Sequence, residues 1–189
     1  MSLSLVGTRD HALLALVVKE AQPIVQTEGF LGRTAVQKIM YFLRVLGVPM
    51  GYNFELYHYG PFCAEILTDL EWLIADNVIK DVSPEQRRYS NYQTDKNIDE
   101  LLDSHTEELV PVRDSVCEIV KALSPLRPER LELFATLDYL YRQKKATGWK
   151  VQFKGWVVEK FLFFKGDKFP REDVERAYDM MANIELLER

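Results

Sequence analysis

The chain lacks the features that mark secreted, disulfide-stabilised and membrane proteins. Its 189 residues include only two cysteines, Cys63 and Cys117, which make no disulfide framework and have no ligand-like neighbour at metal-binding spacing. No apolar run approaches the roughly 20 residues that cross a bilayer. The N-terminal sequence MSLSLVGTRDHALL has no basic region followed by a long apolar stretch. We therefore expect a reduced, cytoplasmic protein without a membrane partner.

Catalytic signatures are also missing. The sequence contains no glycine-rich phosphate loop, no pair of histidines at helical spacing and no nucleophile elbow. His11, His58 and His105 stand singly, which favours packing or hydrogen-bonding roles over catalysis or metal binding. The sequence thus predicts no catalytic residue, no metal site and no cofactor. A site assembled from distant residues leaves no motif, so a hydrolase or nuclease is kept as a third hypothesis.

Charge is unevenly distributed along the chain. The net charge of −5 gives no overall attraction to nucleic acid. Nine lysines and arginines nevertheless gather between Arg142 and Arg171, where only Glu159 and Asp167 oppose them, and aromatic residues lie between them. The other proportions, 47% hydrophobic and 28% charged, are those of a globular protein with one full core or two small ones.

The N-terminal part predicts two helices. Thr8 or Asp10 is placed to cap a first helix that ends at about Gln22, because Pro23 follows. A second helix begins near Thr34, which is suited to its N-cap. The apolar residues of this second helix recur at the spacing of a buried face: Val36, Ile39, Met40 and Leu43.

A strand and a third helix follow. Alternation over residues 54–59 predicts a strand with Phe54, Leu56 and His58 on one face. Gly60 and Pro61 are then expected to turn the chain, with Pro61 in the first turn of a helix that runs to residue 76.

A β-hairpin comes next, and the remainder of the chain reads as helical. Residues 78–82 and 89–94 look like strands around the turn sequence SPEQ, so they predict a wing. In the helical remainder Pro111 is expected to kink or split a helix. The clearest break is at residues 124–128, and the helix from Pro128 to about Lys145 is apolar on several sides and therefore central.

These patterns together predict an α+β fold that is mainly α. Residues 1–96 form a winged-helix-like unit with a small β-hairpin wing. Residues 97–189 form a helical half packed on it, as a second unit or as part of one single domain.

Three short motifs carry a resemblance to a known group of proteins. They are QKIMYFL at residues 37–43, GVP at residues 47–49 and YGPF at residues 59–62. This pattern resembles the YwgA-like proteins of prokaryotes, which look related to the Panacea domain of phage-associated and antitoxin proteins. The resemblance spans residues 8–94 and, more faintly, the helical half. It implies a winged-helix-like or mostly helical domain, a role as a regulator or antitoxin that binds partners, and no catalytic residue.

The leading functional hypothesis is nucleic-acid binding through the wing and the basic stretch. Arginines at a wing tip are placed to reach phosphates or a narrow minor groove, and lysines beside aromatic rings can hold a single strand. The predicted nucleic-acid-binding residues are Arg87, Arg88, Lys144, Lys145, Lys150 and Lys154. The alternative for both groups is a solvated surface whose cations keep it soluble.

The rival hypothesis is a protein-interaction module. The outer face of the third helix carries Glu65, Asp69 and Asp76, which a DNA backbone would repel. Trp72 lies on the same face and is a residue type that anchors protein interfaces. The predicted partner-binding residues are therefore Trp72, Glu65 and Asp69, used to neutralise a toxin or to form a homodimer. The alternative for Trp72 is burial under the C-terminal helices.

Overall fold

A computed structural model of the chain describes residues 3–84, 89–148 and 153–183. These residues form a mainly helical protein with two small antiparallel two-stranded sheets. The helices are α1 Arg9–Glu28, α2 Arg33–Val45, α3 Ala64–Ala75, α4 Ile98–Ser104, α5 Thr106–Leu123, α6 Pro128–Lys145, α7 Lys154–Lys165 and α8 Arg171–Asn183, with a 3-10 turn η1 at Gly166–Lys168. The strands are β1 Glu55–Tyr57, β2 Gly60–Phe62, β3 Ile79–Asp81 and β4 Tyr92–Thr94.

Helix α1 runs through the centre of the N-terminal part. Thr8 caps it as predicted, since its side chain accepts a hydrogen bond from the backbone N–H of His11. The predicted end at Pro23 is wrong, because α1 continues to Glu28 with the proline inside it. The ring of Pro23 is exposed while Val25 beyond it is buried, so packing of the last turn offsets the cost of the proline.

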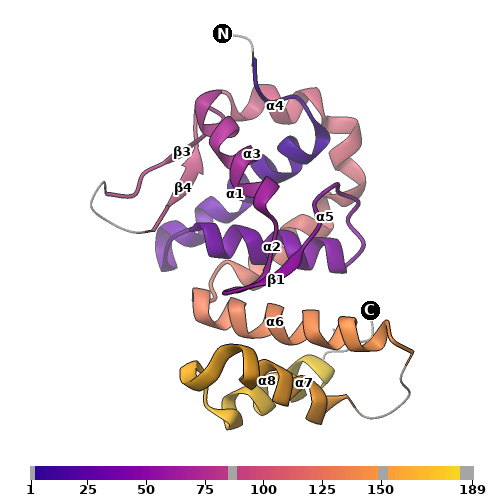
Figure 1. The fold of residues 1–189 in the computed structure, drawn as a ribbon. Coiled ribbons are helices and arrows are strands. Elements are labelled where there is room, and N and C mark those ends of the chain that lie inside the picture. Colours follow the sequence, from indigo (N-terminus) through magenta and orange to yellow (C-terminus); the bar gives the residue numbers. More distant parts are fainter. Residues whose placement is uncertain (1–2, 85–88, 149–152, 184–189) are drawn as a thin grey trace.

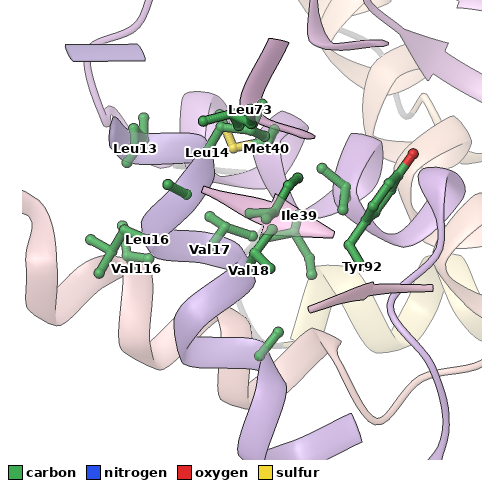
Figure 2. Packing of buried hydrophobic residues seen from close by; sticks show 14 of the residues in the cluster. Leu13, Leu14, Leu16, Val17, Val18, Ile39, Met40, Leu73, Tyr92 and Val116 are labelled. Atoms are coloured by element: carbon green, nitrogen blue, oxygen red, sulfur yellow. The ribbon is translucent and has the colours of Figure 1, made fainter. Parts of the chain in front are cut away.

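The main core is built around α1 and α2. Figure 2 shows leucines and valines of α1 meeting Ile39 and Met40 of α2 and Leu73 of α3. The stripe predicted for the second helix is fully buried, which confirms that helix. Its predicted cap at Thr34 is wrong: α2 begins at Arg33, and Gly32 occupies the N-cap without any side-chain cap.

The strand and turn predicted for residues 54–61 differ from the structure. Strand β1 is only three residues long and turns back through His58 and Tyr59 into β2, so Leu56 pairs with Pro61 and Tyr57 with Gly60. The expectation that His58 shares the face of Leu56 is therefore wrong, and His58 is exposed. Pro61 lies in a strand rather than in a helix, and α3 begins three residues later at Ala64.

Helix α3 ends at a carboxylate that holds the N-terminal segment. Asp76 was expected on the outer face but is buried, and its Oδ2 accepts backbone hydrogen bonds from Ser4, Leu5 and Val6 at 2.7–2.9 Å. Burial alone would raise the pKa of Asp76, but these donors outweigh it and lower the pKa below its ordinary value. Asp76 thus holds the N-terminal segment and does not stand on the outer face of α3 as expected.

The predicted hairpin is present as β3 and β4, which pair in antiparallel register with Ile79 opposite Thr94. It projects from the side of the N-terminal part in Figure 1, and its tip at residues 85–88 lies outside the described residues.

The C-terminal half is helical as predicted. Its first break falls at His105, between α4 and α5, and α5 runs through Pro111 without a second break. Of the two outcomes expected at Pro111, a kink or a split, the split is wrong, because the break lies about six residues earlier. His105 forms the junction because its ring nitrogens lie 3.2 Å from the carbonyl oxygens of Leu101 and Gly7.

Helix α6 is central, which confirms the prediction from a sequence that is apolar on several sides. It crosses the molecule in Figure 1 between α2 on one side and α7 and α8 on the other. Ala135 packs with the aromatic residues of α2, while Leu133, Leu137 and Leu140 join the second hydrophobic cluster with α7 and α8. Among the described residues, no helix has the length and apolar character needed to cross a membrane.

Candidate functional site

Helix α2 carries the QKxxY motif, and the side chains of this motif join α2 to the β1–β2 hairpin and to α6. The amide of Gln37 donates to the backbone carbonyl of Cys63 at 2.7 Å and accepts from the backbone N–H of Cys63 at 3.0 Å. Tyr41 donates to the buried carboxylate of Asp138 on α6 at 2.7 Å, and Arg142 contacts the same oxygen at 2.8 Å. Burial raises the pKa of Asp138 by more than the contacts with Tyr41 and Arg142 lower it. The ionised carboxylate is therefore held at an energetic cost.

Lys38 is the most unusual residue of the motif. Only 2% of its surface is exposed, and its Nζ donates to the carbonyl oxygen of Pro61 at 2.7 Å. Burial lowers the pKa of Lys38 to about 7, because the neighbouring charge of Glu132 opposes this shift only in part and that of Lys165 adds to it. A lysine that changes charge near neutral pH thus lies beneath the hairpin.

The hairpin itself lies directly against α6. Gly60 has a φ of +89°, and a Cβ atom there would lie 2.4 Å from the hydroxyl oxygen of Thr136. Only glycine fits this contact without displacing Thr136 or straining the backbone. The glycine of the YGP motif is therefore explained by packing of the turn on α6.

A buried carboxylate fixes α7 and η1 to this framework. Both oxygens of Glu132 are used, one by Lys165 at 2.9 Å and the other by Lys168 at 2.6 Å. Lys165 also donates to the carbonyl oxygen of His58 at 2.6 Å, so α6, α7 and the hairpin turn meet at one point. Burial lowers the pKa of Lys165 more than its carboxylate partner raises it.

An open groove lies beside this framework, and we call it the aromatic groove. It has a volume of about 510 Å³ and is bounded by the first turns of α2, the hairpin, the base of the wing and the start of α6. Its walls are Phe30, Gly32, Arg33, Thr34, Ala35, Gln37, Lys38, Tyr57, Tyr59, Phe62, Leu67, Tyr89, Ser90 and Pro128.

The aromatic groove combines exposed rings with positive charge. Tyr57 is 59% exposed, Tyr59 is 61% exposed, and Phe30 stacks on Tyr89 with ring centroids 4.7 Å apart. Arg33 is the groove's second cation, after the buried lysine described above. None of the described residues that line the groove is acidic, although the chain as a whole is.

The predicted nucleic-acid-binding residues are only partly described. Arg87, Arg88 and Lys150 lie outside the described residues. Lys144 and Lys145 lie in the last turn of α6. Their Nζ atoms lie over the rings of Trp156 at 5.0 Å and Tyr141 at 5.9 Å.

Other cations of the basic stretch contact carboxylates of the same protein. Lys154 forms an ion pair with Asp179 at 2.6 Å, and Arg171 pairs with Glu159 at 2.8 Å. Lysines of α7 and η1 pair with the buried glutamate of α6, as described above. Much of the positive charge that the sequence shows is therefore paired with carboxylates of the same chain.

The predicted partner-binding residues lie together on α3, with different surroundings. Trp72 is 43% exposed and touches only the edge of the His11 ring among the described aromatic contacts, so burial under the C-terminal helices is wrong. Glu65 is exposed. Asp69 already has partners within the protein, since it accepts a hydrogen bond from Tyr52 at 2.5 Å and lies 3.4 Å from His11.

Sequence reasoning missed the aromatic groove. Its rings come from the loop before α2, from the β1–β2 hairpin and from the segment of the wing just before β4, which are far apart in the sequence. The pair of tyrosines around His58 was the one local signal. Within the described residues, no group of three or more histidines, cysteines or carboxylates lies close enough to hold a metal ion.

Comparison with known proteins adds no further assignment: the sequence matches no protein-family model and no curated protein. The resemblance to the YwgA-like proteins accordingly stays a prediction.

Proposed function

We propose that the chain is a non-enzymatic recognition protein that binds another protein through the aromatic groove. The observation that carries this proposal is the exposure of Tyr57 and Tyr59 on the wall of a 510 Å³ groove. Large aromatic side chains are stabilised by burial, and those left exposed around a concave surface mark interaction sites. Tyrosine is also among the residues that dominate the binding energy of protein interfaces.

The arrangement of the elements supports a more specific description. Helices α2 and α3 followed by the β3–β4 hairpin keep the order of a winged helix-turn-helix. In this part of the chain the groove lies between the start of α2 and the base of the β3–β4 hairpin. The proposed role is that of a regulator or antitoxin-like factor, as the resemblance to the Panacea-related proteins implies.

Two observations favour a protein over nucleic acid as the partner. The cations Lys154 and Arg171 contact carboxylates of this chain, which reduces the field that a phosphate backbone would meet. The groove, in contrast, is apolar and aromatic over most of its wall. The proposal therefore keeps the protein-interaction hypothesis but places the contact in the groove rather than at Trp72.

Site-specific photocrosslinking in cells of the source organism tests this function. A benzophenone amino acid replaces Tyr59 in one variant and Phe163 in the other. Phe163 is a matched control, because it is also aromatic and is 79% exposed, but on α7 and away from the groove walls. We expect a discrete protein crosslink from position 59 that is absent from position 163 and is weakened by Tyr57→Ala.

The same variants decide against the alternatives. Equal crosslinks at both positions, or none at position 59, would contradict the proposal. A titration of labelled duplex and single-stranded DNA at low and moderate salt runs in parallel. DNA binding that Lys144→Glu and Lys145→Glu abolish would support the nucleic-acid hypothesis instead.

A further inference from the structure

Resting on the proposed function, we infer that the aromatic groove binds an acidic peptide segment, in which a carboxylate stands beside an aromatic or large aliphatic side chain. The inference concerns the chemistry of the partner and goes beyond the existence of a binding surface. It depends on where charge and apolar surface lie around the groove.

The charge of the groove walls is complementary to an acidic partner. Arg33 and Lys38 are the two charged residues among the described groove walls, and both are basic in a protein of net charge −5. Lys38 is buried and already bonded to Pro61, so the exposed guanidinium of Arg33 is the charge that a partner meets. An opposite charge placed beside Arg33 in a partly desolvated groove is favoured much more than on an open surface. A partner that fills the groove with neutral groups alone would desolvate Arg33 without compensation.

The start of α2 adds to the same field. Gly32 at the N-cap has no side chain, and no described residue caps the first turn with a side chain. The backbone N–H groups of this turn belong to Arg33, Thr34 and Ala35, all of which line the groove. The positive end of the α2 dipole therefore points toward the same space as the two cationic side chains.

The size and shape of the aromatic groove suit a short peptide segment. A volume of about 510 Å³ lies within the range of about 300–1,000 Å³ typical of ligand pockets, so it holds a short segment with a few side chains. The rings of Tyr57, Tyr59 and Phe62 and the side chain of Leu67 offer apolar contact. A segment with one carboxylate and one or two apolar side chains matches both the field and the walls.

The charge pattern selects a peptide over a nucleic acid strand. A strand carries a phosphate at every nucleotide and needs cations along its whole path. The described groove walls supply two cations, of which Lys38 is buried, in a chain whose net charge is −5. One or two carboxylates meet this arrangement, whereas a continuous series of phosphates does not.

Selection from a library of displayed random 12-residue peptides tests the inference, with the full chain immobilised. We expect enrichment of peptides that pair Asp or Glu with an aromatic or large aliphatic residue. For the best peptide, replacing its acidic residue by the matching amide should weaken binding at least tenfold, the loss expected of a charge-assisted contact. Arg33→Gln should cause a similar loss, and the amide peptide should show no further loss on that variant.

A matched control is Arg113→Gln, which removes an exposed arginine of α5 that lies away from the groove walls. This change should leave the affinity within twofold. Tyr57→Ala should abolish binding of both the acidic and the amide peptide, because it removes the aromatic wall.

The outcomes separate this inference from the proposed function. Enriched peptides without acidic residues, whose binding still depends on Tyr57, would overturn the inference and leave the groove as a protein-binding site. No enrichment, or enrichment of peptides that bind the Tyr57→Ala variant equally well, would overturn both. Tyr57-dependent binding of single-stranded DNA in place of peptides would overturn the inference in favour of nucleic acid.

Discussion

Replacing Lys38 by methionine gives a stability change whose dependence on pH follows directly from the structure. The lysine amine is buried beneath the hairpin, and its pKa falls from an ordinary value of 10.5 to about 7. Each unit of pKa difference between the folded and unfolded states corresponds to about 1.4 kcal/mol. The full shift therefore corresponds to a change of about 5 kcal/mol across the pH range that separates the two pKa values.

The direction of the change is fixed by proton binding. Between about pH 7 and pH 10 the unfolded chain keeps the proton on Lys38 and the folded chain releases it. Since the unfolded state binds more protons there, stability rises with pH. Below about pH 6 both states are protonated, so the burial of a charged amine weakens the fold by a constant amount.

Urea unfolding of the wild type and of Lys38→Met at unit steps from pH 5 to pH 10 measures this effect. Methionine fills a similar volume and does not titrate, and its loss of the bond to Pro61 costs about 1–3 kcal/mol at every pH. The stability of the wild type relative to the variant should rise by up to about 1.4 kcal/mol per pH unit above pH 7. Other groups that titrate in this range are common to both proteins.

Lys19→Met is the control, because Lys19 is a partly exposed lysine of α1 that pairs with Asp99. Its stability difference from the wild type should stay flat between pH 6 and pH 9. A flat difference for Lys38→Met as well would refute the reasoning, since it would mean that the amine of Lys38 keeps an ordinary pKa in the folded protein.

Three further predictions concern the framework of the groove. Gly60→Ala should destabilise the protein by about 3 kcal/mol in denaturant unfolding, because of the positive φ at this position and the collision of the new Cβ atom with Thr136. Gly155→Ala is the control and should be nearly neutral, because nothing lies within 4 Å of a Cβ atom there. Equal effects of the two substitutions would contradict the packing of Gly60 on α6. Asp76→Asn should lose about 1–3 kcal/mol at pH 7. Because the pKa of Asp76 is lowered in the folded state, this loss should be present above about pH 4 and shrink as the pH falls below that value; a loss that does not depend on pH would contradict the assignment. Gln37→Leu should cost about 2–5 kcal/mol, because it leaves one buried backbone N–H and one C=O unpaired, and a loss under 1 kcal/mol in the same assay would show that water replaces the amide.

The helices were largely predictable because their buried faces repeat locally. The stripe of α2 and the apolar residues on several sides of α6 each depend on residues within one helix, so the sequence alone predicts both helices. Two of the errors in the predicted helix boundaries occur at prolines. Pro23 and Pro111 were expected to interrupt helices, but α1 and α5 continue through them, because both prolines are exposed while neighbouring residues pack in the core. Tertiary packing thus overrode a local rule.

The turn at Gly60 shows why the hairpin was not predictable. A proline after a glycine is typical of a helix start, and the local sequence favours that interpretation. What decides the conformation is Thr136 on α6, which lies close to Gly60 in space but 76 residues away in the sequence. Pro61 has no backbone N–H, so its carbonyl oxygen is the only hydrogen-bonding group of its backbone. This oxygen accepts a hydrogen bond from Lys38, and Pro61 therefore fits in β2 without an unpaired backbone group.

The charge distribution along the sequence is misleading for a related reason. Counting residues shows an excess of lysines after Arg142, but it does not show that Glu132 receives two of them or that Asp179 receives a third. These partners come from α6 and α8, on either side of the basic stretch. The groove was missed because its aromatic walls belong to separate loops and its charge consists of two residues in one helix.

The motif that most resembles a known family is, in this structure, part of the framework. Gln37, Lys38 and Tyr41 are buried and bonded to the hairpin or to α6, and Gly60 is held against α6. Buried side chains of this kind do not contact a partner directly, except for the part of Lys38 that lines the groove. In the proposed function, choice of partner is therefore assigned to the exposed aromatic side chains and Arg33 around the framework, and these are the positions where we expect substitution to change binding without changing the fold.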